Sequence, residues 1–282
     1  MNCLETVIFP VAGLGTRMLP ATKVTPKELL PVYDTPLLQF ALDEALAAGA
    51  KRIVLVSHPS KPALAEYLRP DPGLEQKLAA KGKDDLLRAV QASRLPSDVD
   101  LHIVMQTEQL GLGHAVLCGA DVAGDGPVGV ILPDDLMLGA PCLAEMTEAY
   151  DPATMRSLVA AQQVPAENVS RYGIFDCDES RPGATLPARR FVEKPAADAA
   201  PSRLAAVGRY ILDESVFDVL RKTGRGAGGE IQLTDAIAAM GGIHAFRFSA
   251  TRFDCGCRDG LVEATLAVQR ARKRTHLHVA AE

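Results

Sequence analysis

The sequence predicts an α/β fold with a mostly parallel central sheet flanked by helices, and three observations indicate it. Short apolar runs of the kind that form buried strands recur along the chain, beginning at residues 7–11. Stretches of helical character separate these runs. The chain is 48% hydrophobic but only 5% aromatic, which suits an interior packed with Ala, Val and Leu. Strands that alternate with helices form parallel sheets through right-handed crossovers.

The first half of the chain shows this alternation most clearly. After the strand at 7–11, Thr35 and Pro36 are predicted to be the N-cap and first position of a helix that runs to Ala48 and is closed by Gly49. The elements expected next are strands at 52–57 and 101–106, a helix at 114–120 and a strand at 128–132. Ligands of such sheets bind at the carboxyl ends of the strands, so the loops there are the candidate site.

Residues 69–98 interrupt this alternation of strands and helices. The segment is polar and charged, is bounded by prolines and is predicted to be helical. One interpretation is a solvated helical excursion, and the other is a flap or an oligomer contact near the site.

The second half is predicted to be richer in strands. The expected order is strands at 158–164, 171–176, 189–192 and 205–212, helices at 213–221 and 231–240, a strand at 244–248, and a C-terminal helix from Gly260 into the basic run 270–274. We interpret the basic run as a solvated helix end whose cations oppose the helix dipole. Because there is no internal repeat or linker, we expect one continuous domain over residues 1–282.

Charge and composition exclude several classes of function. The net charge of −5 argues against a general nucleic-acid or anionic-membrane surface, so any positive charge that binds phosphate must be local. No apolar run approaches the roughly 20 residues of a spanning helix, and the N-terminus lacks a signal-peptide layout. We therefore expect a cytoplasmic protein. The six cysteines are scattered, and we interpret them as reduced structural thiols, although Cys255 and Cys257 leave a metal or redox role open.

A glycine loop follows the first strand. It reads Gly13-Leu14-Gly15-Thr16-Arg17, and a second cation, Lys27, comes shortly after it. A glycine loop lets backbone N–H groups approach a phosphate, and the two cations can neutralise its charge. The dinucleotide-binding pattern fails because Met18 stands where a third glycine is needed, and no Walker Gly-Lys-Ser/Thr follows. The loop is therefore predicted to bind phosphate in another way.

Paired carboxylates close a later strand. The apolar run at 130–132 ends in Pro133, Asp134 and Asp135. Carboxylate oxygens at the carboxyl end of a strand suit magnesium, although such pairs are also ordinary turn formers.

The segment AGLGTRMLPATK followed by PKELLPV resembles the sugar-nucleotidyltransferase superfamily, and in detail its uridylyl-transferring branch. Thymidylyl- and adenylyl-transferring relatives usually begin with Ala-Gly-Gly, whereas this chain has Val11-Ala12-Gly13. The segment at 226–236, GAGGEIQLTDA, specifically favours the uridylyl branch. The resemblance spans residues 7–264 in unbroken motif order.

The resemblance implies a Rossmann-like, mixed but mostly parallel sheet of the nucleotide-diphospho-sugar transferase type. Its nucleotide-binding half is expected at about 1–150, its sugar-binding half at about 151–256, and the C-terminal helix at 258–282. The implied reaction transfers UMP from UTP to α-D-glucose 1-phosphate and gives UDP-glucose and pyrophosphate, with Mg²⁺ as cofactor. The sugar phosphate attacks in line, so no protein nucleophile is required.

The resemblance also implies roles for individual residues. The predicted catalytic residues are Arg17, Lys27, Asp134 and Lys194, and the predicted metal ligands are Asp134 and Asp254, with Asp135 left as a spare carboxylate. The predicted nucleotide-binding residues are Ala12, Gly13, Gly15, Thr16, Gln106 and Gly111, and the predicted sugar-binding residues are Gly173, Glu193, Lys194 and Val207. His114 is interpreted as a helix-start or packing residue, because in-line displacement needs no imidazole.

Three positions depart from the family pattern, and two alternative functions stay open. Leu110, Gly229 and Cys257 stand where Lys, Asp and Asn are expected. One alternative is a thymidylyltransferase or a transferase for another sugar phosphate. The other is a non-catalytic sugar-nucleotide-binding regulatory protein. A homodimer or homotetramer is implied by the family alone.

Overall fold

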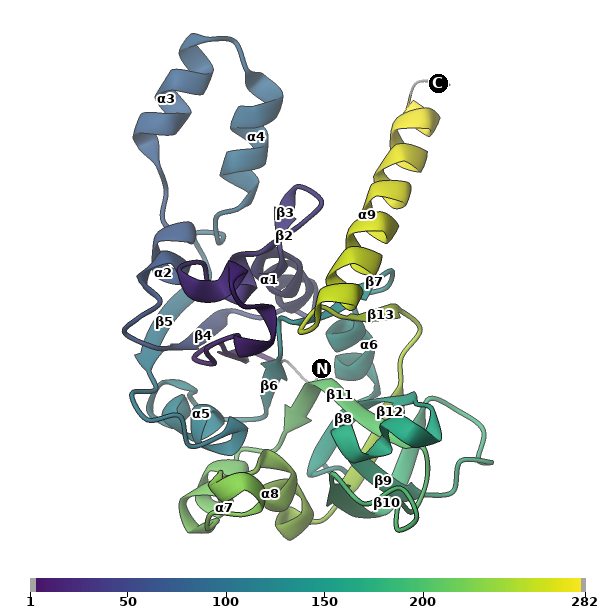
Figure 1. Cartoon of the computed structure of the whole chain (residues 1–282). Helices are drawn as coiled ribbons and strands as arrows, with labels where there is room; N and C mark the ends of the chain where they lie inside the picture. The colour runs from purple at the N-terminus through teal and green to yellow at the C-terminus, as the bar shows by residue number, and fades with distance from the viewer. Residues whose placement is uncertain (1–3, 280–282) are drawn as a thin grey trace.

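The computed structural model describes residues 4–279 and shows a nine-stranded sheet with helices on both faces (Figure 1). The strand order is β5-β4-β1-β6-β11-β8-β12-β10-β9. Within these residues β10 and β11 run antiparallel to all their neighbours, and the other strands of the sheet share one direction. The predicted mixed, mostly parallel α/β fold is confirmed.

The strands of this sheet are β1 (Thr6–Pro10), β4 (Arg52–Ser57), β5 (Asp100–Met105), β6 (Val128–Ile131), β8 (Ser157–Gln163), β9 (Gly173–Cys177), β10 (Thr185–Glu193), β11 (Leu204–Leu212) and β12 (Ile243–Arg247). Two small antiparallel pairs lie outside it, namely β2 (Pro31–Val32) with β3 (Thr35–Pro36) and β7 (Asp135–Leu138) with β13 (Thr251–Asp254).

The helices are α1 (Leu37–Ala47), α2 (Pro62–Tyr67), α3 (Pro72–Ala80), α4 (Asp84–Ala92), α5 (Leu112–Cys118), α6 (Cys142–Ala149), α7 (Val216–Lys222), α8 (Leu233–Met240) and α9 (Arg258–Val279). Among residues 4–279, none of them has the length and apolar character needed to cross a membrane.

The core has one layer on each face of the sheet. Alternate residues of a strand point to opposite faces, so Ile8 packs with α5, α7 and α8, whereas Val7 and Phe9 pack with α1, α2 and α6. All three of these strand residues are fully buried. Burial on both faces explains why the strand reads as a continuous apolar run in the sequence.

This topology gathers the candidate loops at one edge. Because β5, β4, β1 and β6 are parallel neighbours, the glycine loop, Gln106 and the turn at 132–135 all follow strands at the same edge. Strand β11 runs beside β6 in the opposite sense, and the N–H of Leu132 donates to the carbonyl of Gly208 at 2.8 Å. The second half of the chain therefore meets the first at the end of β6.

Several element boundaries differ from the predictions by a few residues, and the starts of α1 and α9 are two of them. The N-cap prediction is wrong, because Thr35 and Pro36 form β3 against β2 and α1 begins at Leu37. The Thr35 hydroxyl donates to Asp34 Oδ1 and so does not cap the helix. Gly49 does close α1 in the left-handed region, with φ of 92°. The C-terminal helix begins at Arg258, two residues before Gly260.

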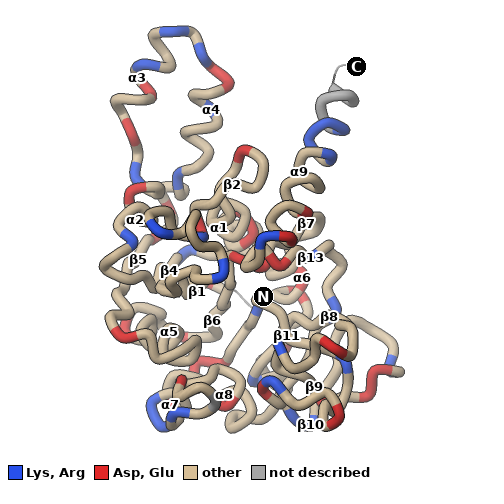
Figure 2. Tube along the Cα trace, in the orientation of Figure 1, with Lys and Arg blue, Asp and Glu red and all other residues tan. Residues whose placement is uncertain are grey.

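Residues 69–98 contain the helices α3 and α4, which form a hairpin that projects from the sheet (Figure 1). Figure 2 shows charges of both signs along it, and neither helix has a buried residue. The hairpin lines neither cleft of the candidate site described below. This placement favours the solvated excursion over a flap, while an oligomer contact stays a prediction.

Candidate active site

The glycine loop is held by its backbone and by a buried ion pair below it. The N–H of Val11 donates to the carbonyl of Val56 at 2.8 Å, and the Lys61 ammonium donates to the carbonyl of Val11 at 2.7 Å. Lys61 also pairs with Glu28 at 2.9 Å, and their side chains are only 7% and 1% exposed. The pair therefore fixes the start of the loop relative to the segment that carries Lys27. No sequence pattern pointed to Lys61.

Gly15 lets the loop turn back towards Lys27. It has φ of 65°, and a Cβ there would lie 3.2 Å from Cβ of Lys27, so a larger residue would be strained and crowded. The Thr22 hydroxyl donates to the Gly15 carbonyl at 2.8 Å. Ala12 and Gly13 line the adjoining cleft, whereas Gly15 and Thr16 do not. The loop thus exposes Gly13 and uses Gly15 for its shape.

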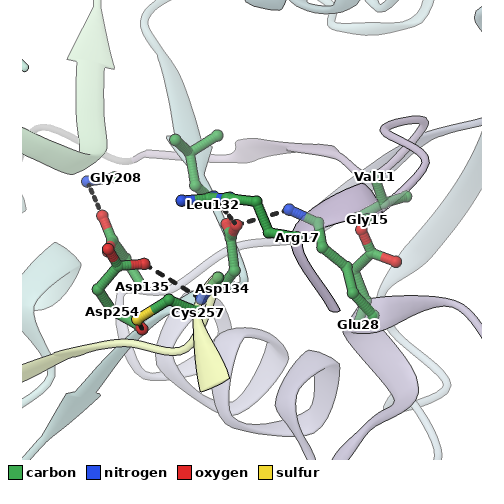
Figure 3. A network of polar contacts seen from close by, with 12 residues as sticks. Val11, Gly15, Arg17, Glu28, Leu132, Asp134, Asp135, Gly208, Asp254 and Cys257 are labelled. Carbon is green, nitrogen blue, oxygen red and sulfur yellow. Dashed lines mark hydrogen bonds and ion pairs between the residues drawn. The ribbon is translucent and has the colours of Figure 1, made fainter. Parts of the chain in front are cut away.

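Asp134 lies between Arg17 and Lys27, the two cations of the glycine-loop segment. Its Oδ2 accepts a hydrogen bond from Lys27 Nζ at 2.5 Å and lies 3.8 Å from the Arg17 guanidinium (Figure 3). Burial acts to raise the pKa of Asp134, but Lys27 and then Arg17 outweigh it and hold that pKa below its usual value. Burial likewise acts to lower the pKa of Lys27, and Asp134 and Glu28 raise it above its usual value. Both groups are therefore charged at neutral pH.

Asp254 comes to the same place from the other end of the chain. A Cβ at Gly256 would lie 2.9 Å from Asp134 Oδ2 and 3.1 Å from Asp254 Oδ1, so the glycine keeps open a small space between the two carboxylates. Asp254 also pairs with Arg171 at 3.3 Å. The structure thus places Arg17, Asp134 and Asp254 around Gly256, and their roles as site residues stay a prediction.

The two carboxylates fit a magnesium site completed by substrate. Mg²⁺ prefers hard oxygen ligands and is usually held by one or two carboxylates together with substrate phosphates and water. Asp134 and Asp254 supply such a pair. Within residues 4–279 no group of three or more His, Cys, Asp or Glu side chains could hold a metal alone. The donor set suits a metal that arrives with a phosphate.

Asp135 is a structural anchor. Its Oδ1 accepts from the Arg252 guanidinium at 2.5 and 2.8 Å. Its Oδ2 accepts from the N–H of Gly208 at 2.7 Å (Figure 3). It joins β7 to β13 and β11, and its antiparallel partner in β13 is Asp254. The carboxylate that looked spare in the sequence therefore fixes Asp254 relative to Asp134.

Arg209 holds the turn at 132–135 in place from the protein interior. This fully buried side chain donates to the carbonyls of Leu132 and Asp135 at 3.1 and 2.6 Å and pairs with Glu44 of α1 at 2.7 Å. Glu44 also accepts from the N–H of Leu143 at the start of α6. Sequence reasoning missed Glu44 and Arg252, because each is an ordinary charged residue until the fold places its partner.

Two clefts adjoin this centre and share Leu112, Leu132, Asp134 and Glu230. The first, which we call the loop cleft, is lined also by Ala12, Gly13, Lys27, Gln106 and Gly111. All of these except Lys27 are predicted nucleotide-binding residues. Gln109, which the sequence analysis did not single out, lines it too and donates to the Ala12 carbonyl at 3.2 Å.

The second cleft, which we call the Lys194 cleft, contains all four predicted sugar-binding residues. Gly173, Glu193, Lys194 and Val207 line it together with Arg17, Arg171 and Asp254. Gly173 allows Phe191 to pack close, since a Cβ would lie 2.7 Å from its ring. Glu193 is held by Lys194 at 3.0 Å and by the Thr234 hydroxyl at 2.6 Å. A carboxylate in such a cleft can accept hydrogen bonds from sugar hydroxyls.

The three departures from the family pattern lie outside both clefts. The Leu110 carbonyl accepts from the N–H of Ile231 at 2.7 Å, which is a backbone contact open to any residue. Gly229 has φ of 75°, a conformation that suits glycine. The Cys257 thiol lies 3.2 Å from the Asp254 carbonyl, behind the carboxylate.

A glycine loop beside two carboxylates and several cations defines a site suited to phosphate esters, and comparison with known proteins specifies the class. The nucleotidyl transferase family model matches residues 7–270, and the chain belongs to this family.

Within the family, the chain is similar to the UTP–glucose-1-phosphate uridylyltransferases. It is 42% identical to that of Bacillus subtilis (strain 168), over 94% of this chain and 91% of the relative. It is 45% identical to that of Haemophilus ducreyi, over 92% and 90%. A UDP-glucose pyrophosphorylase solved with UDP-glucose is 35% identical with a TM-score of 0.85, over 95% of this chain and 99% of that chain. A UTP-bound UGPase from Acinetobacter baumannii has a TM-score of 0.86 at 38% identity, over 94% and 93%. The predicted resemblance to the uridylyl-transferring branch is confirmed.

Proposed function

We propose that this protein transfers UMP from UTP to α-D-glucose 1-phosphate and releases UDP-glucose and pyrophosphate. The observation that carries the proposal is the meeting of two clefts at Asp134. A nucleotide in the loop cleft and a sugar phosphate in the Lys194 cleft would bring their phosphates together near Asp134, which lines both clefts. The similar relatives with this name support the choice of UTP and glucose 1-phosphate.

Electrostatics is the main demand of the reaction, because both substrates are anions. Two unit charges about 5 Å apart repel by about 3 kcal/mol at an effective dielectric constant near 20. Arg17 and Lys27 lie at the boundary of the clefts and are proposed to offset charge that develops on the pyrophosphate leaving group. Lys194 is proposed to hold and align the attacking phosphate. No protein nucleophile is needed for an in-line displacement.

Asp134 and Asp254 are proposed to hold Mg²⁺. When bound, the metal supplies Lewis-acid stabilisation of phosphoryl oxygens. The protein's own part is to keep Asp134 ionised, which Lys27 and Arg17 support, and to hold Asp254 in position beside Asp135.

We propose a separate binding role for each half of the chain, based on the cleft that its residues line. Residues from about 1 to 150 are proposed to bind the nucleotide, through Ala12, Gly13, Gln106 and Gly111, with Gly15 and Thr16 shaping the loop. Residues from about 151 to 256 are proposed to bind the sugar phosphate, with Glu193 accepting from sugar hydroxyls. Helix α9 (Arg258–Val279) follows them, and the last three residues of the helix predicted at 258–282 lie outside the described residues.

The cellular setting and assembly are also proposals. Buried free thiols such as Cys142 and Cys255 suit a reducing compartment, which supports a cytoplasmic location. A homodimer or homotetramer is proposed, and the exposed apolar residues Leu74 and Leu86 of the hairpin and Val262 and Leu266 of α9 are candidate contacts.

Pyrophosphate release with magnesium tests the proposal. UTP and dTTP are each paired with glucose 1-phosphate, galactose 1-phosphate and mannose 1-phosphate, and the expected preference is UTP with glucose 1-phosphate, abolished by a chelator. A preference for another pair would keep the chemistry but replace the substrates. Release with no pair would favour a non-catalytic regulatory protein that binds sugar nucleotides.

A further inference from the structure

His114 lies next to the amide of Gln106, in a position that the proposed reaction does not use. Gln106 follows β5, and its N–H donates to the carbonyl of Ser57 at 2.8 Å, which continues the β4–β5 ladder. The side chain is 4% exposed and lines the loop cleft. Its Nε2 lies 3.2 Å from the Gly111 carbonyl oxygen and 2.9 Å from His114 Nδ1. These two contacts determine which end of the Gln106 amide faces the cleft.

The Gly111 carbonyl fixes which end of the amide faces it. A backbone carbonyl oxygen can only accept hydrogen bonds, so the NH₂ group of Gln106, and not its oxygen, must point there. Gly111 itself cannot move aside easily. Its carbonyl also accepts from the N–H of Ala115 in α5 at 3.1 Å, and a Cβ on it would lie 2.7 Å from Glu230.

This orientation fixes the tautomer of His114 in turn. The second N–H of the Gln106 amide points to His114 Nδ1, so Nδ1 accepts and the ring carries its proton on Nε2. Cys118, one turn later on α5, has its sulfur 4.0 Å from Nδ1 and 3.9 Å from Nε2, so the sulfur does not distinguish the two ring nitrogens and the tautomer rests on Gln106. Burial raises the pKa of the Cys118 thiol, so the sulfur stays neutral. Both N–H groups of Gln106 are then occupied.

The group that remains is an acceptor. Gln106 Oε1 takes no hydrogen bond from any side chain or backbone group of residues 4–279, and the side chain lines the loop cleft. A base seated with its N3 opposite this oxygen must donate from N3. Uracil and thymine carry N3–H, whereas cytosine has a lone pair there and would leave two acceptors facing each other. A buried polar mismatch of this kind is the strongest form of discrimination available to a binding site.

Resting on the proposed function, we infer that His114 is a positioning residue that holds Gln106 with its carbonyl towards the base, and thereby selects nucleotides with an N3–H over cytidine nucleotides. Without the histidine, one N–H of the amide has no partner, and only the longer 3.2 Å contact with the Gly111 carbonyl opposes a turn of the amide about its last torsion. A turned amide would present NH₂ to the base and would suit cytosine instead. His114 thus acts through Gln106 and does not touch the reacting phosphates.

The first test needs no variant. Binding of UTP and of CTP to the wild-type protein is measured by calorimetry without sugar phosphate. We expect UTP to bind at least about tenfold more tightly. Equal or tighter binding of CTP would overturn the orientation of Gln106. Protein that neither binds nor turns over UTP would instead overturn the proposed function, and the inference with it.

The second test concerns the histidine. His114→Phe keeps a ring but removes the acceptor, His114→Ala removes both, and His114→Asn keeps an oxygen near the position of Nδ1. We expect H114F and H114A to lower the ratio of kcat/KM for UTP to that for CTP by about tenfold, through KM for UTP with kcat nearly unchanged. H114N should restore most of the ratio.

The matched control is His244→Phe, because His244 lies on β12, lines neither cleft and should leave the ratio unchanged. Circular dichroism shows whether each variant is folded. If folded H114A or H114F keeps the wild-type ratio, or if kcat falls while KM stays the same, the role assigned to His114 is wrong. If H114F does not fold, H114A and H114N decide by the same ratio.

Discussion

Asp134 and Asp135 are adjacent and chemically identical, yet the fold gives them opposite tasks. Asp134 faces the shared wall of the clefts and meets Lys27 and Arg17, whereas Asp135 points into the structure and meets Arg252 and the Gly208 N–H. The difference arises because Asp134 lies in the turn after β6, whereas Asp135 is the first residue of β7 and its side chain is directed by that strand. The two substitutions to asparagine therefore separate chemistry from stability.

We expect Asp134→Asn to lower turnover by about a hundredfold or more, since it removes a charge next to the reacting phosphates. Asp135→Asn leaves Arg252 largely buried without its counter-charge and should lower the free energy of unfolding by about 3 kcal/mol or more. Steady-state kinetics and urea unfolding on both variants check this. The assignment fails if D134N retains wild-type turnover, or if D135N is as stable as the wild type.

At the scale of elements, the long apolar strands were predictable and the polar junctions were not. Residues 52–57 were placed without error, because a β-branched apolar run between polar flanks leaves little choice. Strands β7 and β13 and helix α6 were missed. The β7–β13 pair joins segments far apart in the sequence, and it is set by Asp135 and Arg252, whose pairing is tertiary. Asp134, Asp254 and Lys194 could be named because motif order carried them, while Lys61, Glu44 and Arg252 follow from the fold alone.

The Glu44–Arg209 pair is the element-scale contact with the largest expected effect. It joins α1 to β11, to the turn after β6 and to the start of α6. Glu44→Gln leaves a fully buried guanidinium without its counter-charge and should destabilise the protein by about 3–5 kcal/mol in urea unfolding. The matched control is Glu66→Gln, which removes an exposed pair with Arg69 and should cost about 0.5 kcal/mol or less. Equal effects of the two variants would contradict this reading of the buried pair.

At the scale of the molecule, both halves of the chain build each cleft. The backbone of Ile231 bonds with Leu110 and Gly113 at 2.7 and 2.9 Å, so the distinctive 226–236 segment of the second half holds the loop that begins α5 in the first. Glu230 consequently lines both clefts. The α3–α4 hairpin takes no part in this arrangement, and Figure 1 shows it projecting away from the sheet.

This separation predicts that the hairpin can be removed without loss of the chemistry. Replacement of residues 72–92 by a short Gly-Ser linker should leave kcat/KM for UTP within a few-fold of wild type, because neither cleft receives a side chain from the hairpin. A short linker can span the gap, since Arg69 and Arg94 on either side of the hairpin line the same small pocket at its base. Light scattering on the same variant tests the oligomer contact, since a fall in mass would place the hairpin at a subunit interface. A folded variant that keeps its mass but loses turnover would show that the hairpin acts on the site directly, and would restore the flap interpretation.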